Sequence, residues 1–160
     1  MSDKKRIAKN TFALYIRMIF VMVISLFSVR IVLEKLGVTD YGVYSSVGGV
    51  VAMLGFLNGT LSTSTSRFIT FELGKGNSQR LRETFSTAFY THLILALIVV
   101  FILTLGGTWF VNYKLIIPEG LKVPALWVFF ISTFTAFISI TQVPYTSMII
   151  ANEKMNIYAY

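Results

Sequence analysis

Four long stretches of apolar residues alternate with shorter polar stretches along this chain. They run from about 11 to 33, 41 to 61, 85 to 111 and 124 to 151. Each supplies the ~20 mostly apolar residues that a helix needs to cross a bilayer. Strands of an outer-membrane barrel alternate in polarity over much shorter segments. The pattern therefore predicts an all-α fold, a polytopic transmembrane helical bundle with four spans.

Glycine and proline mark the ends of these stretches. Gly37 follows the first stretch and suits the left-handed residue that closes a helix. The Gly-Lys-Gly-Asn sequence at 74–77 ends the polar extension of the second, and Pro124 fits the first turn of the fourth. Pro144 removes a backbone hydrogen bond and predicts a kink in the fourth helix.

The composition excludes several classes of protein. Apolar residues make up 55% of the chain and charged residues 13%, about half the charge of a soluble domain. There is no cysteine and a single histidine, His92, so a disulfide framework, a thiolate nucleophile and a multi-histidine metal site are excluded. We expect no enzyme activity, no cofactor and no metal site. His92 itself we expect to be hydrogen-bonded between helices.

The net charge of +7 would suggest nucleic acid in a soluble protein, but in an apolar chain it marks loops on the cytoplasmic side of a membrane. We therefore expect no nucleic-acid partner. Nine basic residues lie before the first stretch, between the second and third, or after the fourth, and they are Lys4, Lys5, Arg6, Lys9, Arg67, Lys75, Arg80, Arg82 and Lys154. The other connections carry three, Lys35, Lys114 and Lys122. This asymmetry predicts that both termini are cytoplasmic.

Two arginines interrupt the first stretch. Arg17 lies five residues from the centre of the span near Met22, about 7.5 Å along a helix. It either extends its side chain to the interface or faces protein or water. The second interpretation is favoured because residues 12–16 continue the apolar pattern, and a guanidinium holds a phosphate through two hydrogen bonds. Arg30 lies about 220° around the helix from Arg17 and is a weaker candidate, near enough to the boundary to reach the interface.

The second stretch contributes two further candidates for substrate binding. Asn58 is its one strongly polar side chain, and Arg67 ends a polar segment from Ser62 that suits water or lipid headgroups. Small residues at helical spacing form one face of the same stretch, namely Ser45, Gly48, Ala52, Gly55, Gly59, Ser62 and Ser66. We interpret this face as a site of close helix packing. The alternative is a smooth wall of a cavity.

Three motifs resemble one family. Residues 36–44, 64–77, and 143–146 with 150–155 are similar to segments of bacterial polysaccharide biosynthesis proteins, the O-antigen type of lipid-linked oligosaccharide flippase. This family belongs to the multidrug/oligosaccharidyl-lipid/polysaccharide exporter superfamily. The resemblance implies transport of undecaprenyl-pyrophosphate-linked oligosaccharide across the bacterial cytoplasmic membrane, with Arg17 in a cationic cavity. It also implies that residues 1–160 are the N-terminal part of a larger lobe, and that further helices follow Tyr160.

Two alternatives remain open at this point. The chain is a drug/cation antiporter of the same superfamily, or a small four-helix membrane protein that acts with a partner. None of the seven acidic residues lies in the apolar core of a stretch, which argues against a cation antiporter because those bind the cation on an intramembrane carboxylate. The expected partners are the lipid bilayer, the lipid-linked oligosaccharide and the remaining transporter helices.

Overall fold

The structure is a computed structural model that describes residues 3–118 and 120–153, with the side chains of 3–10 and 13 outside the description. Every regular element in this part of the chain is helical, as the apolar pattern predicts. The helices are α1 (Asp3–Ala52), α2 (Gly55–Gly74), α3 (Ser78–Ile102), a π-helical segment η1 (Leu103–Gly107), α4 (Thr108–Tyr113), α5 (Lys122–Thr141) and α6 (Val143–Ala151). Several of them follow one another with little interruption and form longer rods.

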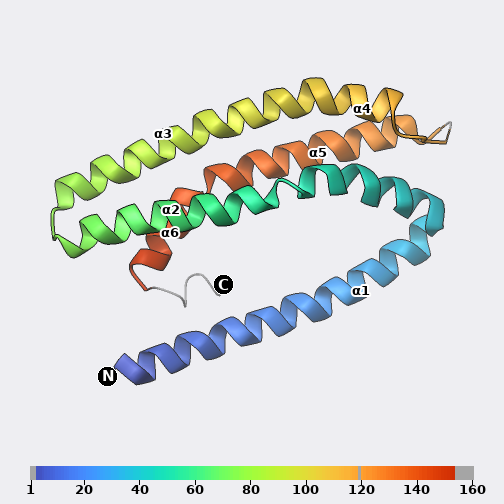
Figure 1. The fold of residues 1–160 in the computed structure, drawn as a ribbon. Coiled ribbons are helices and arrows are strands. Elements are labelled where there is room, and N and C mark those ends of the chain that lie inside the picture. Colours follow the sequence, from blue (N-terminus) through green and yellow to red (C-terminus); the bar gives the residue numbers. More distant parts are fainter. Residues whose placement is uncertain (1–2, 119, 154–160) are drawn as a thin grey trace.

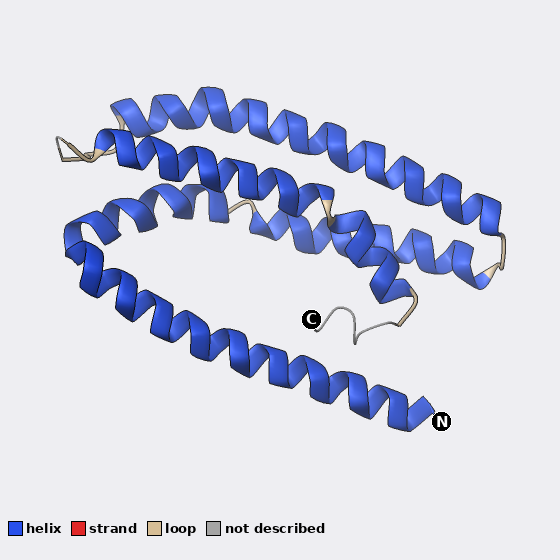
Figure 2. Ribbon diagram, turned by 180° about the vertical axis from the view of Figure 1, so that it is seen from behind, coloured by secondary structure: helices blue, strands red, loops and turns tan. Residues whose placement is uncertain are grey.

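The chain bends sharply within α1. Gly37 has a φ of 78° and a ψ of 171°, a backbone conformation that residues with a Cβ rarely adopt. The predicted end of the first helix at Gly37 is therefore confirmed as a break in the helix. The part of α1 before Gly37 diverges from the rest of the molecule in both views of the ribbon (Figures 1 and 2). Accordingly, every side chain from 15 to 31 is exposed.

A second break separates α1 from α2 at Met53 and Leu54. Sequence analysis predicts one uninterrupted helix over 41–61, and the structure corrects this. The amide of Leu54 donates to the carbonyl of Val51 at 3.0 Å, so a tighter turn replaces the α-helical pattern there. The two parts on either side of the break have different neighbours. Val47 and Val51 join a core with Ala125 and Phe129 of α5, whereas α2 packs mainly on α6 and α3.

The predicted turn between the second and third helices is confirmed. Gly74 ends α2, Gly76 has a φ of 68°, and Asn77 caps α3 by accepting a hydrogen bond from the amide of Arg80 at 3.0 Å. A cap of this kind satisfies one of the free amides at a helix start. The helix begins at Ser78, seven residues before the apolar stretch predicted from 85.

The remaining two rods each contain an irregularity. The π-helical segment lies between α3 and α4 and buries Gly107. Gly107 lies so close to the ring of Phe129 that a Cβ at this position would overlap it. In the last rod, α5 ends at Thr141 and α6 begins at Val143, so the kink predicted at Pro144 is confirmed. Proline lacks the amide that would continue the helix, and here it occupies the first turn of α6 instead.

The start of α1, the α2–α3 turn and the end of α6 lie towards one end of the molecule, while the bend of α1 and the end of α4 lie at the other (Figure 1). Three stretches are long and apolar enough to cross a membrane, namely Leu14–Gly74, Ser78–Tyr113 and Lys122–Ala151. The first has 61 residues and contains the bend at Gly37. It covers the first two of the four spans predicted from the sequence.

Candidate functional site

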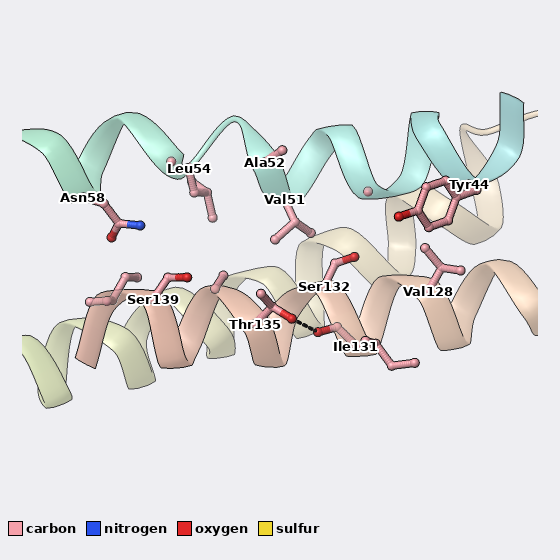
Figure 3. Close-up of a pocket in the computed structure, with 14 residues that line it drawn as sticks. Tyr44, Val51, Ala52, Leu54, Asn58, Val128, Ile131, Ser132, Thr135 and Ser139 are labelled. Atoms are coloured by element: carbon pink, nitrogen blue, oxygen red, sulfur yellow. Dashed lines mark hydrogen bonds between the residues drawn. The ribbon is translucent and has the colours of Figure 1, made fainter. Parts of the chain in front are cut away.

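A cleft separates the second half of α1 and the start of α2 from α5. We call it the interhelical cleft, and its volume is about 440 Å³. Its lining residues are Tyr44, Gly48, Val51, Ala52, Leu54, Gly55 and Asn58 on one side, and Val128, Ile131, Ser132, Thr135, Ala136, Ser139 and Ile140 on the other. No charged side chain is among them. The labelled side chains run along the two helices in the same direction, from Tyr44 beside Val128 to Asn58 beside Ser139 (Figure 3).

Asn58 carries the most unusual polar group in this cleft. Its Oδ1 atom is buried and has no hydrogen-bond partner in the described part of the chain. The carboxamide points from α2 towards Ser139 on α5 (Figure 3). A buried acceptor without a donor costs about 1–3 kcal/mol, so its presence requires an explanation. Polar groups left in this way in a native protein are candidates for binding or for a second conformation.

A second hollow lies on the opposite face of α2, with a volume of about 1240 Å³. We call it the α2 groove. The described residues that line it all belong to α2, and they are Phe56, Gly59, Thr60, Thr63, Ser64, Arg67, Phe68, Phe71 and Glu72. At 100° per residue these positions centre on the side opposite Thr65 and Ile69, which are the buried residues of α2. The groove therefore faces away from α3 and α6.

The groove combines hydroxyl groups with one guanidinium, and the carboxylate of Glu72 lies at its end. Thr63 donates its hydroxyl to the carbonyl of Gly59 at 2.9 Å, and Thr60 lies within 3.5 Å of the carbonyl of Phe56. These bonds leave the oxygen lone pairs free to accept. Arg67 is exposed, one and two turns beyond these two threonines on the same face. An arginine with neighbouring hydroxyls suits an oxyanion such as a phosphate.

The four residues predicted to bind substrate do not meet at one point. Asn58 lines the cleft and Arg67 lines the groove, on opposite sides of α2. Arg17 and Arg30 lie on the exposed part of α1 before Gly37, outside the described linings of both hollows. Arg17 has a contact within the structure. The predicted residues thus divide into one uncharged side chain in the cleft and three arginines at separate positions.

Polar contacts hold the packed side of α2. His92 of α3 is 4% exposed, and its Nδ1 lies 2.7 Å from the carbonyl of Ala88. Since a carbonyl only accepts, Nδ1 donates this hydrogen bond, and Nε2 lies 3.5 Å from the hydroxyl of Thr65. The prediction that His92 is hydrogen-bonded between helices is confirmed. Ser147 of α6 donates to the carbonyl of Ser62 at 3.3 Å.

The structure corrects our interpretation of the small-residue face of the second stretch as a site of close helix packing. A Cβ placed on Gly55 or Gly59 would meet nothing within 4 Å, and one on Gly48 would meet only the Ser132 hydroxyl at 3.9 Å. Gly48, Ala52 and Gly55 line the interhelical cleft. These three residues therefore form a cavity wall, the alternative considered from the sequence. Close packing of this face begins further along, where Ser62 meets Ser147.

The opposite wall of the cleft was missed by sequence analysis, although its signal is present. Ser132, Ala136 and Ser139 repeat the spacing of Gly48, Ala52 and Gly55.

No group of three or more histidine, cysteine, aspartate or glutamate side chains suited to a metal occurs among the described residues. No family model, curated protein or solved structure matches this chain.

Proposed function

We propose that this chain forms membrane helices of a transporter that moves a lipid-linked oligosaccharide across the bacterial cytoplasmic membrane. The motif resemblance supports this function, and so does the all-helical, strongly apolar structure. The observation that carries the proposal is the α2 groove, where a guanidinium and several hydroxyls share one face of a long apolar helix. Such a face is costly beside lipid tails unless it meets a polar partner, and a lipid pyrophosphate is a partner of the right charge.

The proposal includes four crossings of the membrane. A straight helix of 61 residues would measure about 92 Å, three times the ~30 Å core of a bilayer. The bend at Gly37 divides this stretch into two segments that each suffice for one crossing. With the two later stretches this gives four spans, and both chain ends then lie on one side. The asymmetry of the basic residues supports the cytoplasm as that side.

The exposed first segment of α1 also supports a lipid-linked substrate. The part of α1 before Gly37 diverges from the other helices (Figure 2), and its side chains from 15 to 31 are exposed. A substrate with a lipid tail has to enter its transporter sideways from the bilayer. In this proposal Arg17 supplies a second positive charge on the path, and Arg30 and Asn58 are further contacts along it. The remaining transporter helices complete the cavity.

Export of surface polysaccharide tests the function directly. The gene containing this chain is expressed in a strain that lacks its own flippase, and surface polysaccharide is measured. We expect Arg67→Ala and Arg17→Ala to abolish export at unchanged membrane levels, and the corresponding lysine variants to be partly active because lysine keeps the charge without the two-pronged geometry. Arg80→Ala is the matched control, since Arg80 is exposed in the α2–α3 region and pairs only loosely with Glu83 at 3.9 Å.

Full complementation by Arg67→Ala and Arg17→Ala would reject the phosphate-binding role. Transport of a cationic drug without complementation would instead favour the antiporter of the same superfamily.

Topology is tested separately by cysteine labelling, which is possible because the chain contains no cysteine of its own. A cysteine introduced at Asn77 should resist an impermeant thiol reagent in intact cells, whereas one at Lys114 should react. The reverse labelling pattern would overturn the cytoplasmic placement of both termini.

A further inference from the structure

The two walls of the interhelical cleft match each other in spacing and direction. Gly48, Ala52 and Gly55 face a wall with Ser132, Ala136 and Ser139, and the steps of four and three residues are the same on both sides. The two helices run in the same direction in the close-up (Figure 3). Small residues at helical spacing on two parallel helices are what close contact between membrane helices requires. Here the two surfaces are complementary but enclose about 440 Å³ of space.

The cleft narrows towards one end. A Cβ on Gly48 would lie 3.9 Å from the Ser132 hydroxyl, whereas a Cβ on Gly55 would meet nothing within 4 Å. The narrow end belongs to α1, which shares a core with α5 through Val47 and Val51. The wide end belongs to α2, beyond the break at Met53 and Leu54. At that break the chain leaves the α-helical pattern, and the amide of Leu54 donates to the carbonyl of Val51 at 3.0 Å.

The unsatisfied groups lie at the wide end. Asn58 Oδ1 is buried without a donor, and no hydrogen bond from Ser139 to another described residue occurs. The Asn58 carboxamide already points towards Ser139 (Figure 3). If α2 approached α5, the hydroxyl of Ser139 would be the nearest donor for that oxygen. One movement would therefore bring the small-residue walls together and satisfy the buried acceptor.

We infer that the interhelical cleft is the open form of a gate, which closes when the start of α2 swings about Met53–Leu54 onto α5. Gly55 then packs against Ser139, and Asn58 accepts a hydrogen bond from the Ser139 hydroxyl. The inference rests on the shape and polar groups of this cleft and holds whatever the substrate is. It explains why Gly55 has no neighbour in this structure.

Disulfide cross-linking in membranes tests the gate, since the chain has no cysteine to interfere. A disulfide needs Cβ atoms about 3.8 Å apart, and a Cβ on Gly55 meets no atom within 4 Å in the open form. We expect mild oxidation of the full chain to cross-link the pair Gly55→Cys/Ser139→Cys efficiently, because the gate closes transiently. The pair Gly48→Cys/Ser132→Cys, at the narrow end, should cross-link fastest. Phe56→Cys/Ile138→Cys is the negative control, because both side chains are exposed.

A variant with a larger side chain in the cleft tests whether cross-linking requires α2 to close onto α5. Ala52→Leu places a larger side chain in the cleft and should lower the yield of the Gly55–Ser139 cross-link several-fold, while the protein stays folded because the cleft has room. Asn58→Ala removes the acceptor and should lower the yield as well. The gate is rejected if the Gly55–Ser139 pair fails to cross-link while the Gly48–Ser132 pair succeeds. It is also rejected if Ala52→Leu leaves the yield unchanged, because the walls then never meet.

Discussion

The two faces of α2 have different surroundings although they belong to one helix. The packed face carries Thr65 and Ile69, both buried, and contacts α3 and α6 through His92 and Ser147. The groove face carries Thr63 and Arg67 and has no described helix against it. Sequence alone shows the same mixture of small, hydroxyl and apolar residues on both. The difference teaches that a polar residue in a membrane helix supports folding or binding according to the face on which it lies.

The largest effect is expected on the packed face. Ile69 is completely buried, so Ile69→Ala should lower the free energy of unfolding by about 2–5 kcal/mol through lost contacts and a residual cavity. Phe71→Ala, on the groove face, is the control because Phe71 is 60% exposed. Equilibrium unfolding in mixed micelles, followed by circular dichroism, measures both. Equal losses in the two variants would remove the distinction between the faces.

The contact between Gly107 and Phe129 contrasts with the open space beside Gly55. A Cβ at Gly107 would overlap the Phe129 ring, so Gly107→Ala should destabilise the fold by about 1–3 kcal/mol, the usual cost of overpacking. The same unfolding assay applies. A neutral Gly107→Ala variant would mean that α3 and α5 adjust freely at the π-helical segment.

His92 is expected to have a smaller effect. Replacing it with Phe leaves the Thr65 hydroxyl without its partner on α3, and we expect a loss of about 1 kcal/mol, typical for one hydrogen bond. In a double-mutant cycle, Thr65→Val should cost less in the His92→Phe background than in the original chain. Full additivity of the two substitutions would show that the 3.5 Å contact contributes nothing.

Gly55→Leu should have the smallest effect on stability. Its Cβ faces open space in the cleft, so expression level and unfolding free energy should stay within about 0.5 kcal/mol of the original chain, as for substitutions away from packed features. This reverses the expectation that a stripe of small residues marks tight packing. A loss comparable with that of Gly107→Ala would restore the packing interpretation of Gly55.

The breaks at Gly37 and Pro144 could be predicted from the sequence, whereas the break at Met53–Leu54 and the π-helical segment could not. Gly37, the Gly-Lys-Gly-Asn turn and Pro144 each impose a local backbone preference that the structure follows. The break at Met53–Leu54 has no proline, and it separates a segment that packs on α5 from one that packs on α6. The π-helical segment likewise depends on the contact between Gly107 and Phe129. Such features arise from contacts between distant parts of the chain.

The candidate site was predictable in its residue types and not in its arrangement. Asn58 and Arg67 both stand out in the sequence, but nine positions on a helix place them on opposite faces. Which face would be packed depends on α3 and α6. The basic side chains before Thr11, as well as Lys154, lie outside the described residues, and the cytoplasmic placement of both termini stays a prediction.

Binding of an anionic lipid to the α2 groove tests the central claim most directly. The probe is farnesyl pyrophosphate, added to the chain in nanodiscs of uncharged lipid, with farnesol as the comparison. We predict that Arg67→Ala weakens pyrophosphate binding by about 2 kcal/mol, or about thirtyfold in Kd, the cost of losing a hydrogen bond to a charged group. Arg80→Ala should leave the Kd unchanged. Equal Kd values for Arg67→Ala and the original chain, or equal binding of farnesol, would contradict the assignment of the groove to a phosphate headgroup.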